Sequence, residues 1–301
     1  MFSIQQNKKL QKWIKKRKNE ITIFIIALFF LDIAIFGHII QTEIEKDLLK
    51  IYFLDVGQGD SALIELPGGA RMLVDGGPPN KKVLREITKA LSPFERRIDI
   101  AAHTHPQLDH FGGIIDILKR YKVNAYVSNG ITRDIPSYIA LESAIKNHTQ
   151  KNITLRAGDK IRYGESTIHV LYPTQNAVET EKDPNNSSLV FLIESKGVKT
   201  LLTADISKKT EKIIVSTSDV HNIDILKVAH HGSKNSSSKE FLEAAQPNIS
   251  IIQVGKNSYG HPAPDTLKRL QSIDTQIYRN DHDGTIKITA DGSTVKIFTL
   301  K

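Results

Sequence analysis

The sequence predicts an α/β fold in which two β-sheets pack face to face with helices outside, preceded by one transmembrane helix. Three observations support this fold class. Residues 21–40 form a nearly unbroken apolar run. Residues 48–301 consist of short apolar strands, turns and amphipathic helices. That pattern occurs twice, each time β-rich at first and then alternating helix and strand, which indicates one domain built from two similar halves.

The composition is that of a globular protein, and it excludes one kind of site. Of the 301 residues, 40% are hydrophobic and 25% are charged, which is ample for a large core. There are no cysteines, so disulfides and thiolate metal ligands are excluded. Residues 1–20 hold seven basic side chains and one acidic one, so of the net charge of +8 only +2 belongs to residues 21–301. Composition therefore does not indicate a basic face for nucleic acid.

Residues 21–40 (ITIFIIALFFLDIAIFGHII) are predicted to span a membrane, for which about 20 apolar residues suffice. Asp32 costs about 2.5–3.5 kcal/mol, which the surrounding apolar residues offset. The basic residues 1–20 come first, so they are expected in the cytoplasm and the rest outside. No small-residue cleavage site follows, which favours an uncleaved anchor over a signal peptide; a buried helix of a soluble protein is the other alternative. Residues 41–47 (QTEIEKD) are predicted to be a polar linker.

The first half of the predicted domain at 48–301 begins with strands and continues with alternating helices and strands. Its strands are short apolar runs bounded by turn residues, and residues 67–69 (PGG) predict a hairpin turn. Its helices have apolar residues three and four positions apart, as in residues 81–91. In order, the elements are strand 50–56, hairpin strands 61–66 and 71–74, helix 81–91, strand 97–102, helix 114–121, strand 123–127 and helix 138–148.

The second half repeats this order by the same criteria. Lys196-Gly197 and Asp291-Gly292 are turn signals that predict two further hairpins. In order, the elements are strands 153–155, 160–163 and 167–171, hairpin strands 188–194 and 200–203, helix 208–216, strand 223–228, helix 239–245, strand 248–254, helix 264–271, strand 276–278 and hairpin strands 285–289 and 294–299.

Metal-competent side chains follow four of these strands. Strand ends that open into loops are where α/β folds place their sites. A hydrolytic metal needs imidazole and carboxylate ligands and an open position for water, and Gly112-Gly113 lets the backbone pass close to such a site. The residues are Asp75 after strand 71–74; His103, His105, Gln107, Asp109 and His110 after strand 97–102; Asp205 after strand 200–203; and His230 and His231 after strand 223–228. Together they predict a metal-dependent hydrolase.

The run THPQLDHFGG at 104–113 resembles the His-x-His-x-Asp-His motif of the metallo-β-lactamase superfamily. Further motifs match in order: LDVGQGDS at 54–61, LVDGG at 73–77, NSSL at 186–189, LLTAD at 201–205, LKVAHHGS at 226–233, YGHP at 259–262 and YRNDHDGTI at 278–286. Together they resemble the metallo-β-lactamase-like domain of the ComEC family of competence DNA-uptake proteins, over about residues 48–301. The resemblance implies a four-layer αββα sandwich and phosphodiesterase chemistry that degrades the DNA strand that is not imported.

The resemblance also implies a role for each matching residue. The direct matches are His105 with the first metal ligand, Asp109 and His110 with the Asp-His pair of the second metal position, and Asp205 with the bridging carboxylate. His231 best matches the last histidine ligand, with His230 as second choice. Asp75 matches the aspartate that braces the ligand loop.

Two departures from the superfamily motif affect the expected metal. Gln107 stands where the superfamily has its second histidine, and residues 185–189 offer no histidine as the third ligand of the first site. The first site would keep His105, the Gln107 side-chain oxygen and Asp205, and the second would keep Asp109, His110, His231 and Asp205. So many oxygen ligands suit manganese or magnesium better than a pair of zinc ions. We expect one or two divalent ions, manganese or zinc.

Other motif residues are candidates for contacts with the substrate. His261 is expected to contact the substrate or the transition state, and the backbone at Ser233 to bind a phosphate. Asp60 is a candidate to reach the site. Asn186 and Ser187 are candidates to hydrogen-bond the substrate or metal-bound water.

The sequence therefore predicts a membrane-anchored, extracytoplasmic metal-dependent hydrolase that cleaves single-stranded DNA, with Asp109, Asp205 and His261 as catalytic residues. Since the chain has one apolar span, we expect a separate membrane channel as partner. Two alternatives remain open. The low charge of the domain favours a small ester, lactam or phosphorylated substrate. Gln107 and the missing third histidine favour a non-enzymatic binding module whose first metal site has decayed.

Overall fold

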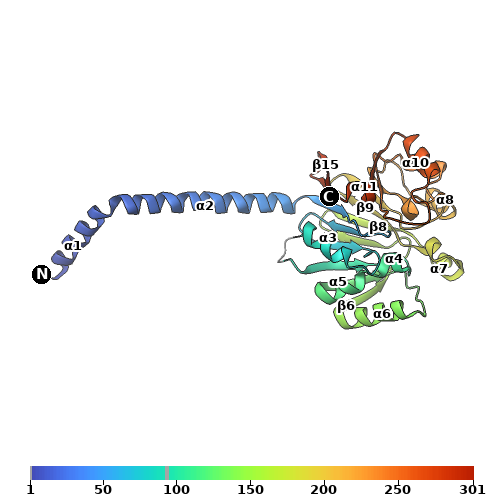
Figure 1. Cartoon of the computed structure of the whole chain (residues 1–301), viewed down its shortest axis with the longest axis horizontal. Coiled ribbons are helices and arrows are strands. Elements are labelled where there is room, and N and C mark those ends of the chain that lie inside the picture. The colour runs from blue at the N-terminus through green and yellow to red at the C-terminus, as the bar shows by residue number, and fades with distance from the viewer. Residues whose placement is uncertain (1, 92–94) are drawn as a thin grey trace. The chain divides into compact units, whose positions relative to one another are not determined.

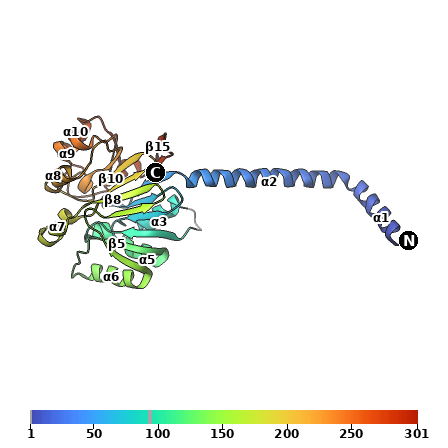
Figure 2. The same cartoon turned by 180° about the vertical axis from the view of Figure 1, so that it is seen from behind.

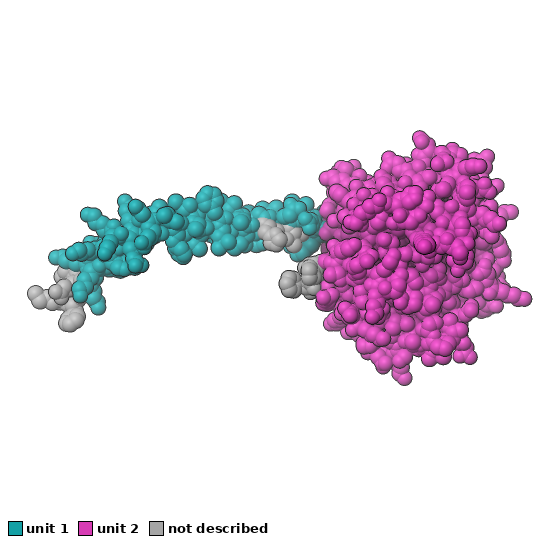
Figure 3. All heavy atoms as spheres, viewed as in Figure 1, with its two compact units in different colours: residues 1–47 teal, residues 48–301 magenta. Residues whose placement is uncertain are grey.

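The structure is a computed structural model that describes residues 2–91 and 95–301, without the side chains of residues 2–5, 38 and 42. The chain divides into two compact units, residues 1–47 and residues 48–301, which are coloured separately in Figure 3. Each unit is considered by itself below.

The first unit consists of helices α1 (Phe2–Lys16) and α2 (Lys18–Lys46). Among the described residues, α2 is the one helix that is long and apolar enough to cross a membrane, with a mean hydropathy of 2.6 over its most apolar stretch. It contains the expected span at 21–40 and most of the residues expected to form a linker. Residues 41–46 continue the helix, where Gln41 donates to Glu45 at 2.9 Å and Lys46 pairs with Glu43 at 2.6 Å. Such pairs three and four residues apart stabilise a polar helix end.

The second unit contains two sheets. The eight-stranded sheet has the order β15-β14-β1-β2-β3-β4-β5-β6, and the seven-stranded sheet has the order β13-β12-β11-β10-β9-β8-β7. The strands of the first are β1 Leu49–Phe53, β2 Ala62–Glu65, β3 Arg71–Val74, β4 Arg97–Ala102, β5 Lys122–Ser128, β6 Thr149–Thr154, β14 Thr285–Ala290 and β15 Val295–Leu300. Those of the second are β7 Lys160–Tyr163, β8 Ser166–Tyr172, β9 Val190–Ser195, β10 Val198–Leu202, β11 Ile225–Lys227, β12 Ile249–Ile252 and β13 Gln276–Arg279.

The two sheets pack against each other, and helices cover both outer faces. Side chains alternate along each strand, so each strand contributes residues to both faces of its sheet. In β1, Ile51 and Phe53 join the core between the sheets, whereas Tyr52 joins a second core under α3 (Lys82–Ala90), α5 (Ile114–Arg120) and α6 (Pro136–His148). A third core lies under α8 (Lys208–Thr217), α9 (Lys239–Ala245) and α10 (Pro264–Gln271). Figures 1 and 2 show the two helix groups on opposite sides of the sheets. The expected αββα layering is confirmed.

The symmetry of the two halves is lower than the sequence suggests. The C-terminal hairpin β14–β15 follows the second half in the chain but joins the first sheet, where β14 pairs antiparallel with β1. Short helices also occur where loops were expected: α4 Leu108–Phe111, α7 Gln175–Thr180, α11 Asn280–Asp283 and the 3-10 turns Pro184–Ser187 and Ala229–Gly232.

Parallel pairing brings the site loops together. Strands β3, β4 and β5 are parallel neighbours in one sheet, and β10, β11 and β12 are parallel neighbours in the other. The carboxyl ends of parallel neighbours meet at the same edge of a sheet. The loops after β3, β4, β10 and β11, which carry the motif residues, therefore open together.

Candidate metal centre

Histidine and aspartate side chains from both sheets meet at this edge. His105 and His110, which follow β4, lie with Asp205, which follows β10, so that one ligand atom of each falls within 4.8 Å of the others. Asp109, His110 and His231 form a second such group. The sequence prediction that these loops converge is thus matched by the geometry.

In each of the three central histidines, one ring nitrogen has a hydrogen-bond partner and the other has none. The Nδ1 atoms of His105, His110 and His231 lie 3.0 Å from Thr104 Oγ1, 2.8 Å from Asp75 Oδ2 and 2.8 Å from the Gln253 carbonyl oxygen, respectively. Their Nε2 atoms are buried and have no hydrogen-bond partner. This is how histidine ligands of a metal are arranged, with a second group fixing the ring and its tautomer. The orphaned nitrogens therefore fit a divalent ion.

Asp75 organises two of these rings. One of its oxygens accepts from the Thr104 backbone amide, and the other accepts from the Thr104 hydroxyl, each at 2.8 Å. Because that hydroxyl donates to Asp75, its oxygen must accept from the Nδ1–H of His105. Asp75 thus fixes His110 directly and His105 through Thr104. Close backbone packing supports this loop, because a Cβ at Gly113 would lie 2.1 Å from the Gly76 carbonyl oxygen.

Two carboxylates complete the cluster. Asp205 Oδ2 lies 3.3 Å from His110 Nε2 and 3.4 Å from His231 Nε2, and Asp109 Oδ2 lies 3.6 Å from the same His231 nitrogen. Asp205 is buried, whereas the Asp109 side chain is 35% exposed. Asp205 can thus face the ion from the protein interior and Asp109 from the solvent side. A set of imidazoles and carboxylates accommodates manganese or zinc.

Ring protons on histidine balance the negative charge of these carboxylates. Burial lowers the pKa of His105 to about 3, and the nearby His110 cation adds to the shift, so His105 is neutral at pH 7. Burial also disfavours the charged form of His231, but the carboxylates of Asp205 and Asp60 outweigh it and raise the pKa of His231 to about 10. A cation that binds here therefore replaces ring protons.

Lys227 belongs to the cluster, although it was not predicted from the sequence. Its side chain on β11 is 3% exposed, and its Nζ contacts the Asp60 carboxylate, donates to the Ala204 carbonyl at 2.9 Å and lies 3.6 Å from Asp205 Oδ1. The available signal was a lysine inside the apolar run Ile225–Val228. Asp60, a candidate in the sequence, is buried here with Oδ1 at 3.2 Å from His231 Nδ1.

The turn after β11 separates the roles of the two adjacent histidines. His230 and His231 both have left-handed backbone conformations, with φ of 50° and 52°, which is costly for residues other than glycine. The turn directs His231 into the cluster. It leaves the His230 side chain 30% exposed, with Nε2 at 3.8 Å from Asp205 Oδ2. His231 is therefore the better ligand candidate of the two.

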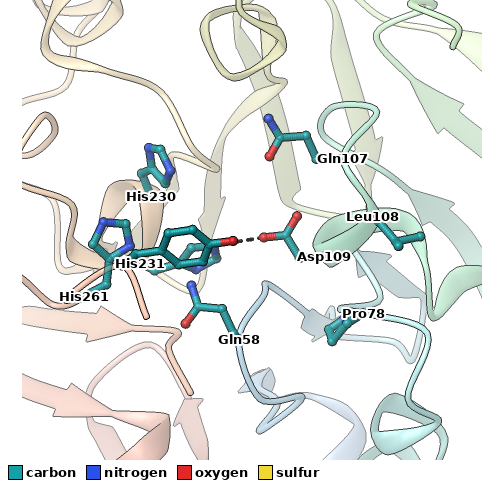
Figure 4. Close-up of a pocket in the computed structure, with 9 residues that line it drawn as sticks. Gln58, Pro78, Gln107, Leu108, Asp109, His230, His231 and His261 are labelled. Atoms are coloured by element: carbon teal, nitrogen blue, oxygen red, sulfur yellow. Dashed lines mark ion pairs between the residues drawn. The ribbon is translucent and has the colours of Figure 1, made fainter. Parts of the chain in front are cut away.

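A cavity of about 420 Å³ opens over the cluster. In Figure 4, His230, His231 and His261 lie on one side, and Gln107, Leu108 and Asp109 on the other. The His230 and His261 rings are 5.5 Å apart, and the buried His261 Nδ1 has no hydrogen-bond partner. The remaining lining residues are Gln58, Pro78 and Tyr259. Gln107 and His261, both predicted from sequence, thus lie in the cavity wall.

Several predicted contact residues use their polar groups within the fold. The Asn186 side-chain oxygen accepts from the backbone and hydroxyl of Ser207 and from the Thr210 hydroxyl. The Ser187 hydroxyl donates to the Pro184 carbonyl. The Ser233 backbone amide donates to the His230 carbonyl, and its hydroxyl accepts from the Asn235 amide. His103 is fully buried against Tyr126, 2.7 Å from its hydroxyl. The described residues that line the cavity do not include Asn186, Ser187 or Ser233. His103 was not a candidate for substrate contact, and it lies in the core.

Two curated relatives align with most of this chain. The chain is 31% identical over 258 residues to ComE operon protein 3 of Bacillus subtilis, and it is 25% identical over 276 residues to Recombination protein 2 of Haemophilus influenzae. These alignments cover 79% and 90% of this chain but 32% of each relative, so the chain spans about a third of their length. Both are ComEC-family members, and the expected resemblance is confirmed.

A solved structure shares the fold of this chain, and a family profile shows its superfamily. The metallo-beta-lactamase fold protein YhfI from Bacillus subtilis has a TM-score of 0.54 and 14% identity, covering 79% of this chain and 99% of that one. The profile of the metallo-beta-lactamase superfamily matches residues 54–256. That span covers more than half of the chain and includes every residue of the cluster. The chain therefore belongs to the metallo-β-lactamase superfamily of metal-dependent hydrolases.

Proposed function

We propose that residues 48–301 form a metal-dependent phosphodiesterase that hydrolyses single-stranded DNA. The observation that carries the proposal is the set of three orphaned imidazole nitrogens facing the Asp109 and Asp205 carboxylates at the floor of an accessible cavity. The names of two relatives, Recombination protein 2 of Haemophilus influenzae and Competence protein ComA of Neisseria gonorrhoeae, support nucleic acid as the substrate.

The residues of the cluster and the cavity would have different roles. His105, His110, His231, Asp109 and Asp205 would hold one or two divalent ions, manganese or zinc. When bound, such an ion supplies a Lewis acid and a water molecule of lowered pKa. Asp75 and Thr104 keep the two rings after β4 in the ligating tautomer. Burial and the neighbouring His230 lower the pKa of His261. Its neutral ring, in the cavity wall, would donate one ring N–H to a phosphate oxygen.

Cleavage assays test the proposal. The full chain in detergent, with manganese or zinc, should cleave end-labelled single-stranded DNA faster than the duplex, and a chelator should stop the reaction. Asp109→Asn and Asp205→Asn should each lose more than about 100-fold in rate, because ligands matter at least as much as the groups that orient them. Asp134→Asn, at an exposed carboxylate outside the cavity, is the matched control. Absence of metal-dependent cleavage, or cleavage by both ligand variants at the rate of the parent protein, would rule the nuclease out.

One observation favours a second candidate, a small ester, lactam or phosphorylated substrate. A cavity of about 420 Å³ has the size of a small-molecule site. None of the described residues that line it is a lysine or arginine. The same preparations can be assayed with a chromogenic cephalosporin, a p-nitrophenyl ester and bis-p-nitrophenyl phosphate. Turnover of one of these without DNA cleavage would select this candidate.

We also propose that α2 anchors the protein in the cell membrane by a single pass, with the N-terminus cytoplasmic and the folded unit outside, beside a separate channel. The basic residues before residue 21 support this orientation. The chain has no cysteine, so Lys8→Cys and Lys296→Cys each introduce a unique thiol at an exposed position. A membrane-impermeant maleimide on intact cells should label the second variant only. Labelling of Lys8→Cys would reverse the orientation.

A further inference from the structure

Tyr259 exposes its aromatic ring to solvent beside the cavity. It is 74% exposed, the highest value among the large hydrophobic side chains of the described residues. It also lines the cavity over the metal cluster. A single exposed aromatic ring is common on protein surfaces. What distinguishes Tyr259 is that its exposed ring lies on the rim of the cavity over the metal cluster. The position therefore points to a ligand.

The loop that carries Tyr259 is held rigidly. The Asn257 side-chain oxygen accepts from the backbone amides of Tyr259 and His261, each at 3.1 Å, and its amide donates to the carbonyls of Gly255 and His261 at 2.9 and 2.8 Å. A Cβ at Gly255 would lie 2.4 Å from the backbone of Gly57, so this loop packs tightly on the loop after β1. The exposed ring thus stands on a fixed support, which a loosely ordered loop would not provide.

The Tyr259 ring lies next to the histidines on the metal side of the cavity. The centroids of the Tyr259 and His261 rings are 5.8 Å apart at an interplanar angle of 33°, and the His261 ring lies 5.5 Å from that of His230. Across the cavity, Leu108 is 42% exposed. Aromatic and aliphatic groups therefore border a polar floor of imidazoles and carboxylates. That arrangement fits a substrate that carries a flat apolar group next to an anionic one.

A nucleic-acid strand has this alternation of flat base and phosphate. A cavity of about 420 Å³ holds one small-molecule-sized piece of a polymer, so the neighbouring nucleotide must lie on the rim, where Tyr259 stands. Bases stack on aromatic side chains without regard to sequence. We propose that Tyr259 is a stacking platform that receives the base next to the phosphodiester held at the metal cluster. This inference rests on the proposed nuclease function and names a residue that would bind a base of the substrate.

The test combines ring variants with substrates that lack a base. Full-length protein in detergent is compared with Tyr259→Ala, with Tyr259→Phe, which keeps the ring, and with Tyr163→Ala, which removes an exposed tyrosine from β7 outside the cavity. The substrates are a short oligothymidylate and the same oligomer with single abasic residues placed along it. Fluorescence anisotropy of labelled oligomers on chelator-treated protein gives a dissociation constant that does not depend on cleavage.

Removing the Tyr259 ring should weaken substrate binding and leave the chemical step nearly unchanged. Tyr259→Ala should raise KM and the dissociation constant for oligothymidylate about 10- to 100-fold with little change in kcat, while Tyr259→Phe and Tyr163→Ala stay near the parent protein. With the abasic residue at the sensitive position, the parent and Tyr259→Ala should become equal. Base stacking would be overturned if Tyr259→Ala had the KM and dissociation constant of the parent protein, or if it lost equal affinity for both substrates. Cleavage by the parent protein would still support the nuclease in either case. If the parent neither binds nor cleaves oligothymidylate, both proposals fail.

Discussion

Lys227 places a buried positive charge among the carboxylates of the metal cluster. Its ammonium touches Asp60, lies 3.6 Å from Asp205 and is almost completely shielded from water. Burial lowers the pKa of a lysine, yet these two carboxylates outweigh burial and raise the pKa of Lys227. A buried charge of this kind is tolerated only when its partners are present. Lys227 should therefore be needed to keep Asp60 and Asp205 ionised in place.

Lys227→Met should lower the free energy of unfolding of the chelator-treated protein by about 3–5 kcal/mol, because it leaves buried carboxylates without their ammonium partner. Urea denaturation measures this loss. Lys208→Met, at an exposed lysine of α8, should stay within about 0.5 kcal/mol of the parent. Adding Asp60→Asn to Lys227→Met removes the uncompensated charge and should restore part of the loss. A loss below about 1 kcal/mol in the single variant would contradict the role given to Lys227.

Residues whose chemistry is fixed by type and spacing could be predicted from the sequence. His105, Asp109 and His110 lie in one short motif, and the fold brings them together as that motif implies. Lys227 could not be predicted, because a lysine in a strand is normally exposed, and only the three-dimensional position of Asp60 explains its burial. Asn186 shows the opposite case. A polar residue in a matching motif was expected at the site, but its oxygen binds three donors near the start of α8.

At the scale of elements, local signals located most strands and helices closely. β3, α9 and α10 have the predicted bounds, since a turn, a proline or a helical repeat marks their ends within a few residues. Sheet membership is a long-range property, and the sequence suggested the wrong symmetry for the hairpin β14–β15. Its apolar alternation is equally suited to either sheet. The hairpin is assigned to the free edge of β1 only by the observed pairing, which runs from Phe53↔Ile286 to Leu49↔Ala290.

The same limit applies to short polar segments. Residues 41–46 have the composition of a linker, but they continue α2 because neighbouring side chains pair along the helix. The turn after β11 adopts left-handed conformations at two histidines, which no propensity scale favours. Such strained turns persist where surrounding structure enforces them. Here the enforcing contact is the hydrogen bond of the His231 ring with the Gln253 carbonyl on the next strand's loop.

At the scale of the whole folded unit, the metal cluster joins the two sheets. His105, Asp109 and His110 follow a strand of the eight-stranded sheet, whereas Asp205 and His231 follow strands of the seven-stranded sheet. A ligand set of this kind exists only when both sheets are packed together. Binding of an ion is therefore linked to folding of the complete unit and not to either sheet alone.

Manganese or zinc should accordingly raise the melting temperature of the full chain in detergent, and a chelator should reverse the effect. An ion at 100 times its dissociation constant stabilises by about 2.7 kcal/mol, which for a unit of this size corresponds to about 5–10 °C. All eight tyrosines lie in residues 48–301 and the single tryptophan is Trp13, so near-ultraviolet circular dichroism of tyrosine reports this unit. Asp205→Asn should abolish the shift and Asp134→Asn should keep it. A shift of the same size in Asp205→Asn would mean that the ion binds elsewhere and does not link the two sheets at this cluster.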